Sequence, residues 1–381
     1  MDAQLQDSRF ALGFAQTAHA LGASVLTHAR VDGVAEVDAA MRLVVRDLLR
    51  DRTCQLGAKL VVNAAGAWID ELRGARAKEK PLVEPSQGIH LVVDRIAEVP
   101  LIFSLPVDGR VFFVLPYGRD ASLVGTTDTP IVGPPDAARP TRRDVNEILS
   151  YLFRFFPRLA EEKEYTTRHV RDVYWGLRPL LRHGGKAARA SREHAVVRES
   201  AAWWSVPGVK LTAARAVGEE VALKAVEALR RERLPEIDLG SLPGGDIQDY
   251  DEFLEQSVNE LVAAGLGADT ASYLTRTYGT RATSVMERAK ADAALARRVL
   301  PDEPWIYAQA AYAVDEEMVL TLNDLLWRRT KWAHYRQLPP DVIARLAQLL
   351  GERLAWAPAQ RSSEIEAYDL EWSRHRFPIP G

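Results

Sequence analysis

The sequence predicts an α+β protein in two parts: a mixed helix and strand region over residues 1–235, and an all-α region over residues 246–381. Three observations support this prediction. Helical and strand periodicity alternate over the first 62 residues, short β-rich runs separated by turn residues recur from His90 to Gly125, and strand patterns disappear after Tyr250. The stretch 234–245, rich in Pro and Gly, indicates a linker, and 381 residues exceed what one ordinary core holds.

The first part begins with a predicted helix over Ser8–Leu21. Phe10, Phe14 and Ala18 stand at i, i+4 and i+8 on one face, and Gly22 follows the end. Short apolar runs then predict strands, and this order favours an α/β layer over a helix bundle. The expected strands are Ala23–Thr27, Leu43–Val45 and Leu60–Val62.

The middle of the chain predicts an antiparallel sheet followed by a helix. Turn pairs such as Asp108-Gly109 and Tyr117-Gly118 separate the β runs. Thr141-Arg142-Arg143-Asp144 resembles a capping box, and Pro157 ends the helix behind it. The further elements expected here are strands at Leu91–Val93, Val111–Val114, Ser122–Val124, Val170–Trp175, His194–Val197 and Trp203–Val206, and a helix over Ala213–Arg231.

The composition excludes several classes of protein. A formal net charge of -3 gives no reason to expect a partner nucleic acid. A single cysteine, Cys54, allows neither an intrachain disulfide nor a multi-cysteine metal site, which favours a reducing, cytoplasmic compartment. The first residues lack the pattern of a signal peptide, and no apolar run is long enough to predict a membrane-spanning helix. Peripheral membrane contact is left open.

Two turns at strand ends are candidate ligand sites. Residues 60–68 form a buried strand that enters the small-residue turn Asn63-Ala64-Ala65-Gly66, where the backbone can approach a ligand. Pro207-Gly208-Val209-Lys210 ends another strand at the start of a helix. Lys210 adds a full positive charge to a helix N-terminus, which is unfavourable unless an anion compensates it.

Three further side chains have chemistry suited to a site. Arg178 and Arg192 stand in β contexts, and arginine binds phosphate through paired hydrogen bonds. His90, at a strand start, has a side chain that can act as a base near neutral pH. Taken singly, each of these residues is more often an ordinary surface or packed side chain than part of a site.

Six motifs occur together in one order. They are Asn63-Ala64-Ala65-Gly66, Gly88-Ile89-His90-Leu91-Val92-Val93, Gly125-Thr126-Thr127-Asp128, Gly176-Leu177-Arg178-Pro179-Leu180, Ser191-Arg192 and Lys210-Leu211-Thr212. This series resembles the FAD-dependent glycerol-3-phosphate dehydrogenases. The segment around Asp7 and Arg9 is similar to one inside that family's FAD domain. Residues from Tyr278-Gly279 to Glu364-Ile365-Glu366-Ala367-Tyr368 are similar to its helical cap.

The resemblance implies a glutathione-reductase-like FAD domain, incomplete in these residues, with an antiparallel substrate sheet and an all-α C-terminal domain. It implies oxidation of glycerol 3-phosphate to dihydroxyacetone phosphate, with electrons passing through FAD to quinone. A homodimer and contact with the inner face of the cytoplasmic membrane are left open. By the resemblance, His90, Arg178, Arg192 and Lys210 line the substrate pocket. Ala65, Gly66, Trp68, Gly208, Lys210 and Thr212 lie at the FAD.

The sequence departs from the family pattern in ways that keep alternatives open. No Gly-x-Gly-x-x-Gly follows a strand near the first residue, so the turn that holds the FAD pyrophosphate is not found. Val209 stands where the family has glycine, Ala67 where it has proline, and Ala213-Ala214 where it has Thr-Tyr. The alternatives are a related FAD-dependent amine or amino-acid oxidase, a cofactor-free non-catalytic fragment, and a chain completed by a segment encoded upstream.

Overall fold

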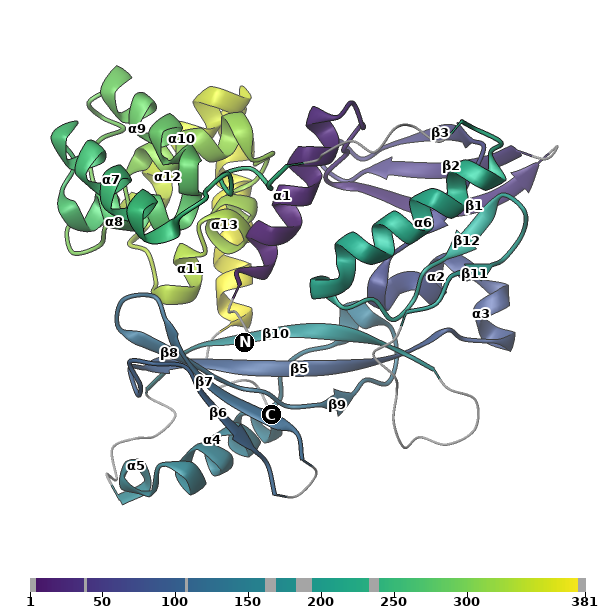
Figure 1. Ribbon diagram of the computed structural model, residues 1–381, viewed down its shortest axis with the longest axis horizontal. Coiled ribbons are helices and arrows are strands. Elements are labelled where there is room, and N and C mark those ends of the chain that lie inside the picture. The colour runs from purple at the N-terminus through teal and green to yellow at the C-terminus, as the bar shows by residue number, and fades with distance from the viewer. Residues whose placement is uncertain are drawn as a thin grey trace. The chain divides into compact units, whose positions relative to one another are not determined.

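The computed structural model describes residues 5–37, 40–106, 109–161, 169–182, 194–232 and 240–375 (Figure 1). The fold separates into two compact units. Met1–Val25 and Asp238–Arg376 form the helical unit, and Leu26–Ile237 is the main part of the sheet unit.

The sheet unit contains three β-sheets among its described residues. In the first, β1 (Ala29–Val37), β2 (Ala40–Asp47) and β3 (Arg52–Ala58) form an antiparallel meander. In the second, the strand order is β10-β5-β8-β7-β6, with β9 also paired to β5, and all pairs are antiparallel. Its strands are β5 (Val83–Asp94), β6 (Leu101–Ser104), β7 (Val111–Tyr117), β8 (Ala121–Gly125), β9 (Thr129–Pro130) and β10 (Val170–Leu181).

The third sheet is small and contains a parallel pair. β12 (Trp203–Ser205) lies between β11 (Val197–Arg198) and β4 (Val61–Asn63), antiparallel to the first and parallel to the second. Apart from α4, the sheet unit also contains helices among its described residues. They are η1 (Gly66–Trp68), α2 (Ile69–Arg73), α3 (Ala75–Glu79), η2 (Pro135–Ala137), α5 (Pro157–Glu161), η4 (Leu211–Ala213) and α6 (Ala214–Ala228).

Helix α4 (Arg142–Phe155) covers one face of the six-stranded sheet (Figure 1). Its start is the predicted capping box: the Thr141 hydroxyl accepts from the Asp144 backbone N–H, and the Asp144 carboxylate accepts from that of Thr141. The apolar face of α4 packs on alternate residues of β5, including Ile89 and Leu91. Because strand side chains alternate between faces, the even-numbered residues of this part of β5 point away from α4.

The helical unit holds the C-terminal part of the chain, from Asp238, together with the first helix. Its helices are α1 (Asp7–Ala20), α7 (Tyr250–Ala263), α8 (Ala268–Tyr278), η5 (Gly279–Arg281), α9 (Ala282–Ala291), α10 (Tyr307–Glu316), η6 (Asp324–Arg329), α11 (Trp332–Tyr335), α12 (Pro340–Leu354) and α13 (Pro358–Arg374). No helix in the described ranges combines the length and the apolar character needed to cross a bilayer.

Helix α1 is fixed to this unit by a buried ion pair. Arg9 Nη2 lies 2.8 Å from Glu317 Oε1, and the Glu317 side chain is 1% exposed. The Arg9 guanidinium also lies 4.6 Å from the centroid of the Tyr278 ring. Burial, the largest single effect, lowers the pKa of Arg9, but the charge of Glu317, the hydrogen bond to it and the neighbouring tyrosines together outweigh burial, and the net shift is upward. Arg9 therefore stays charged and neutralises Glu317.

The predicted α+β class with an all-α C-terminal region is confirmed. The helix at Ser8–Leu21, the strands near residues 43, 61, 91, 111 and 122, and the capping box also match. The compact sheet unit begins at Leu26, and α1 belongs to the helical unit. The placement of the linker, residues 234–245, falls partly on residues 233–239, which lie outside the described residues.

Several predicted elements need correction. Ala23–Thr27 is not a strand, since this run has no partner among the described strands, and Leu26 is 65% exposed. The strand at Val170–Trp175 extends to Leu181 because it pairs with β5 along its whole length. The predicted strand His194–Val197 is reduced to β11, and the helix expected to reach Arg231 ends at Ala228.

Candidate active site

Two turns lie side by side at the carboxyl end of the parallel strand pair. Asn63, the last residue of β4, stands opposite Ser205, the last residue of β12. β4 leads into the turn Ala64–Gly66, and β12 leads into residues 206–210. Because the carboxyl ends of parallel strands meet at one edge of a sheet, both turns border the same space, which is where ligands bind in such sheets.

Asn63 holds the first turn in shape. Its buried side chain accepts a hydrogen bond from the backbone N–H of Ala65 (3.2 Å) and donates from Nδ2 to the carbonyl of Ile69 (2.9 Å). Gly66, inside the turn, has a φ of +56°, a left-handed conformation that favours glycine. A Cβ at Gly66 would meet no atom within 4 Å, so this stretch of backbone is open to a ligand.

The second turn presents a lysine at the start of a helical segment. Gly208 has a φ of +80°, and the carbonyl of Lys210 accepts from the N–H of Ala213 at the beginning of η4. The side chains of Lys210 and Thr212 are exposed. Lys210 makes no ion pair or side-chain hydrogen bond with the residues that the structure describes. Its charge is therefore available to an anionic ligand.

An apolar cavity of about 600 Å³ lies between these turns and α6. Gly66 and Gly208 contribute backbone from the two turns, and Pro179 contributes from β10. The face of α6 supplies Val217 and Val221. An apolar wall with a few backbone polar groups at its edge suits a flat aromatic ring system.

Trp68, at the end of η1, borders a second and more polar cavity of about 650 Å³. Its Nε1 donates to Asp136 Oδ1 at 3.0 Å, and its side chain remains 40% exposed. Glu71 and Arg30 line the same cavity. Desolvation and the neighbouring charge of Asp136 raise the pKa of Glu71, while Arg30 opposes that shift.

His90 and Arg178 lie on one face of the six-stranded sheet, the face away from α4. Arg178 on β10 pairs with Ser86 on β5. Paired residues of antiparallel strands point to the same side, and residues two apart on a strand share a face. Ser86, Gly88 and His90 therefore share the face of Arg178.

The guanidinium of Arg178 lies flat across Gly88. A Cβ at Gly88 would stand only 2.2 Å from Arg178 Nη2. From this position Nη2 donates to the hydroxyl of Thr126 (2.8 Å). Nη1 donates to the carbonyl of Thr127 (3.0 Å) and lies 3.3 Å from Asp128 Oδ1. The side chain keeps 27% exposure, so the guanidinium is oriented and still accessible.

His90 occupies space that another glycine leaves open. Gly125 pairs with His90, and a Cβ there would stand 2.7 Å from His90 Cδ2. The ring centroids of His90 and Tyr174 are 6.4 Å apart. Gly88 and Gly125 thus allow the side chains of Arg178 and His90 to lie against the sheet.

The predicted site residues fall into two groups. His90 and Arg178 share the sheet face, and Pro179, next to Arg178, is part of the cavity wall. Ala65, Gly66, Gly208, Lys210 and Thr212 belong to the two turns that border it, and Trp68 follows the first turn. Arg192 lies outside the described residues.

Sequence reasoning assigned no role to Gly88, Gly125, Thr126 or Asp128. A signal for the two glycines was present, because a glycine inside a strand often marks a close approach of another group. The partners of Arg178 carried no such signal: Thr126 and Asp128 are 52 and 50 residues away in the chain.

Ligands of open α/β sheets bind at the carboxyl edge of the strands, and an apolar cavity with a few polar groups at its edge is the usual form of a cofactor or small-molecule site. The chain belongs to the family of FAD-dependent oxidoreductases, whose model matches residues 1–223. The model for the C-terminal domain of alpha-glycerophosphate oxidase matches residues 240–361.

Curated relatives and a solved structure agree with this family. The chain is 29% identical over 377 residues to glycerol-3-phosphate dehydrogenase 2 of Mycobacterium tuberculosis, covering 96% of this chain and 62% of the relative. It is 27% identical to mouse mitochondrial glycerol-3-phosphate dehydrogenase, covering 96% of this chain and 51% of the relative. The crystal structure of the glycerol-3-phosphate dehydrogenase from Bacillus halodurans complexed with FAD aligns with a TM-score of 0.82 at 25% identity, covering 99% of this chain and 75% of that one. The chain thus spans about half to two thirds of the curated relatives' length.

Proposed function

We propose that this chain forms the flavin-side and substrate-side part of an enzyme that oxidises sn-glycerol 3-phosphate to dihydroxyacetone phosphate with FAD. The observation that carries the proposal is the guanidinium of Arg178, which is oriented across Gly88 and accessible, while the neighbouring Pro179 lines an apolar cavity. Relatives in bacteria and animals are named glycerol-3-phosphate dehydrogenases, and these names support the same substrate.

The residues present fit the flavin end of FAD. Ala65, Gly66 and Gly208 offer backbone at the cavity edge, where a Cβ on Gly66 would find open space. Trp68 and Thr212 flank the two turns, and the N-terminal end of η4 with Lys210 favours negative charge at the flavin. When bound, FAD supplies a two-electron acceptor for the hydride that leaves C2 of the substrate.

The cationic side chains bind the phosphate of the substrate, and a histidine accepts the proton of its hydroxyl group. Arg178 holds the phosphate by charged, paired hydrogen bonds, and Lys210 adds a second cation. Arg192 joins them by the family resemblance. His90 takes the proton from the C2 hydroxyl, since imidazole acts as a base near neutral pH. Together, these cations favour a phosphate over the single carboxylate of an amino acid.

Further parts of the proposal rest on the resemblance and on the relatives' names. Electrons pass from the reduced cofactor to quinone, in keeping with a relative named aerobic glycerol-3-phosphate dehydrogenase. The enzyme works on the cytoplasmic side, in peripheral contact with the inner face of the cytoplasmic membrane, and as a homodimer. Residues 1–235 and 246–381 are the two functional domains, and the family models over residues 1–223 and 240–361 support this division.

The decisive experiment mixes the purified chain with FAD and then adds substrate without oxygen. We expect measurable FAD binding, weak because these residues contain no Gly-x-Gly-x-x-Gly turn, and bleaching of the flavin absorption by glycerol 3-phosphate. Bleaching by amines or amino acids instead would identify a related oxidase. No binding at saturating FAD would identify a cofactor-free role for these residues.

A further inference from the structure

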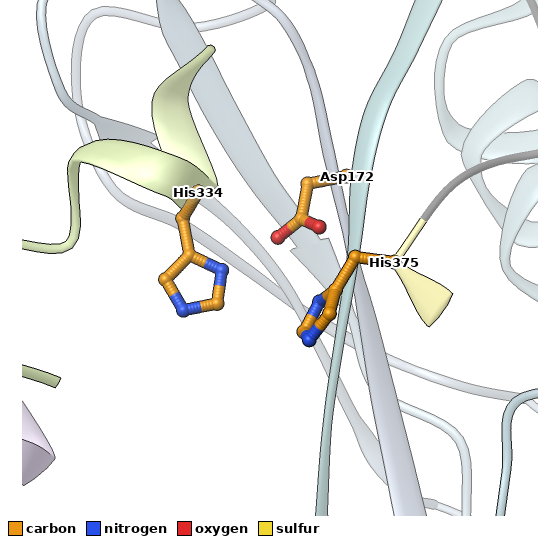
Figure 2. A group of neighbouring side chains, drawn as sticks. All are labelled: Asp172, His334 and His375. Atoms are coloured by element: carbon orange, nitrogen blue, oxygen red, sulfur yellow. The ribbon is translucent and has the colours of Figure 1, made fainter. Parts of the chain in front are cut away.

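Three consecutive residues supply hydrogen-bond acceptors to the guanidinium of Arg178. The hydroxyl of Thr126 lies 2.8 Å from Nη2, and the carbonyl of Thr127 and the carboxylate of Asp128 lie 3.0 and 3.3 Å from Nη1. Another carboxylate of β10, that of Asp172 (Figure 2), is on the same face of the strand but stands roughly 20 Å from Arg178, at about 3.3 Å per residue. Movement of segment 126–128 would therefore displace all three of these contacts together.

Strand β5 fixes two residues of this segment. The hydroxyl oxygen of Thr127, a fully buried residue, accepts a hydrogen bond from the backbone N–H of Ile89 at 3.1 Å. The hydroxyl of Ser86, which is also buried, donates to the Asp128 carboxylate. Neither bond holds the end of the segment that continues into β9, and β9 pairs with β5 over only two residues.

A side-chain hydrogen bond to helix α4 holds that end. The hydroxyl of Thr129, in β9, donates to Oδ1 of Asp144 at 2.8 Å. Asp144 is the buried carboxylate of the capping box, and its other oxygen, Oδ2, accepts from the N–H of Thr141 at 2.8 Å and from the Thr141 hydroxyl at 2.6 Å. One oxygen thus caps the helix, and the other binds the segment next to Arg178. The cap requires only Oδ2, so it does not account for the bond to Thr129.

We propose that Thr129 and Asp144 are positioning residues for Arg178, because their hydrogen bond keeps segment 126–128 in place. This inference rests on the proposed function, in which Arg178 binds the phosphate of glycerol 3-phosphate. A hydrogen bond to an ionised carboxylate is roughly twice as strong as one between neutral groups, and burial strengthens it further. Neither Thr129 nor Asp144 contacts the guanidinium in the printed distances of Arg178, so both act through the segment between them.

The first test measures kinetics of the full chain at saturating FAD. Thr129→Val should lower kcat/KM for glycerol 3-phosphate about tenfold, since misplacement of a binding group by about 1 Å can cost up to a hundredfold. The loss should appear in KM and not in kcat, because the phosphate does not react, and kcat/KM for glycerol should be unchanged. Thr129→Ser keeps the hydroxyl and should restore wild-type values.

Thr141→Val is the matched control, because it removes a hydroxyl bonded to the other oxygen of the same carboxylate. It should lower the urea midpoint of unfolding about as much as Thr129→Val and leave kcat/KM for glycerol 3-phosphate near wild type. Thr129→Ala removes the same hydroxyl as Thr129→Val without adding a methyl group, and the two variants should agree. Wild-type kinetics in folded Thr129→Val and Thr129→Ala, or an equal kinetic loss in Thr141→Val, would overturn the proposal.

A second measurement needs neither flavin nor substrate. Phenylglyoxal modifies arginine side chains, and mass spectrometry of the FAD-free chain follows its reaction at Arg178. We expect Arg178 to react severalfold faster in Thr129→Val than in the wild type, Thr129→Ser or Thr141→Val. An unchanged rate in Thr129→Val would refute the role of the Thr129–Asp144 bond. Failure of the wild-type chain to oxidise glycerol 3-phosphate would instead refute the proposed function, so the two failures are distinguishable.

Discussion

Substitution of Gly88 by alanine should displace the arginine of the proposed substrate site without disturbing the sheet. The new Cβ would stand 2.2, 2.5 and 2.7 Å from Nη2, Cζ and Nη1 of Arg178. All three atoms belong to the far end of a flexible side chain, so Arg178 moves and β5 does not. Gly88 has no left-handed φ, and its backbone therefore accepts alanine.

The displaced guanidinium loses its hydrogen bonds to Thr126 and Thr127 and with them its orientation toward the substrate. A hydrogen bond to a charged group contributes about 1.5–3 kcal/mol. With about 1.4 kcal/mol for each factor of ten, kcat/KM for glycerol 3-phosphate should fall about ten- to a hundredfold in the FAD-loaded enzyme. The free energy of unfolding, measured in urea, should change by less than about 1 kcal/mol.

The chain offers a matched control for this variant. Gly57 lies in β3 of another sheet, has no left-handed φ, and a Cβ there meets no atom within 4 Å. Gly57→Ala should therefore leave both kinetics and stability near wild type. Wild-type kinetics in a folded Gly88→Ala protein, or an equal kinetic loss in Gly57→Ala, would refute the placement of Arg178 at the substrate.

Four further outcomes are expected. Arg178→Ala should lower kcat/KM about ten- to a hundredfold for glycerol 3-phosphate but not for glycerol, and equal losses in paired kinetic assays would mean a structural role. Lys210→Met should weaken glycerol 3-phosphate binding while unfolding free energy stays within about 0.5 kcal/mol; unchanged substrate titration removes Lys210 from the site. Gly125→Ala places a Cβ 2.8 Å from a backbone carbonyl and should cost about 1–3 kcal/mol in urea unfolding, whereas unchanged stability would contradict the packing. Arg9→Met leaves Glu317 as a buried charge without its partner and should lower the free energy of unfolding by about 3–5 kcal/mol. The double variant with Glu317→Gln should recover most of this loss, and a double variant as unstable as the single one would contradict the ion pair.

The sequence alone correctly predicted those elements that depend only on residues close together in the chain. The capping box at Thr141 satisfies backbone groups within four residues, so it is visible in the sequence and present in the structure. The same holds for the glycines of the two turns, since a left-handed φ is a property of one residue. The predicted strand Ala23–Thr27 was wrong because a strand needs a neighbouring strand to pair with. This run has the composition of a strand, but none of the described strands lies beside it.

Part of the candidate site was likewise predictable from the sequence, and part of it depended on the tertiary structure. Its residue types and their order, from Gly66 to Lys210, were readable along the chain and pointed to a flavin and a phosphate. The placement of Arg178 over Gly88 came only from the register between β10 and β5. Sequence periodicity reports which face of an element is buried. Which side chains meet there depends on contacts between residues far apart in the chain, and those are decided only when the sheets and helices pack.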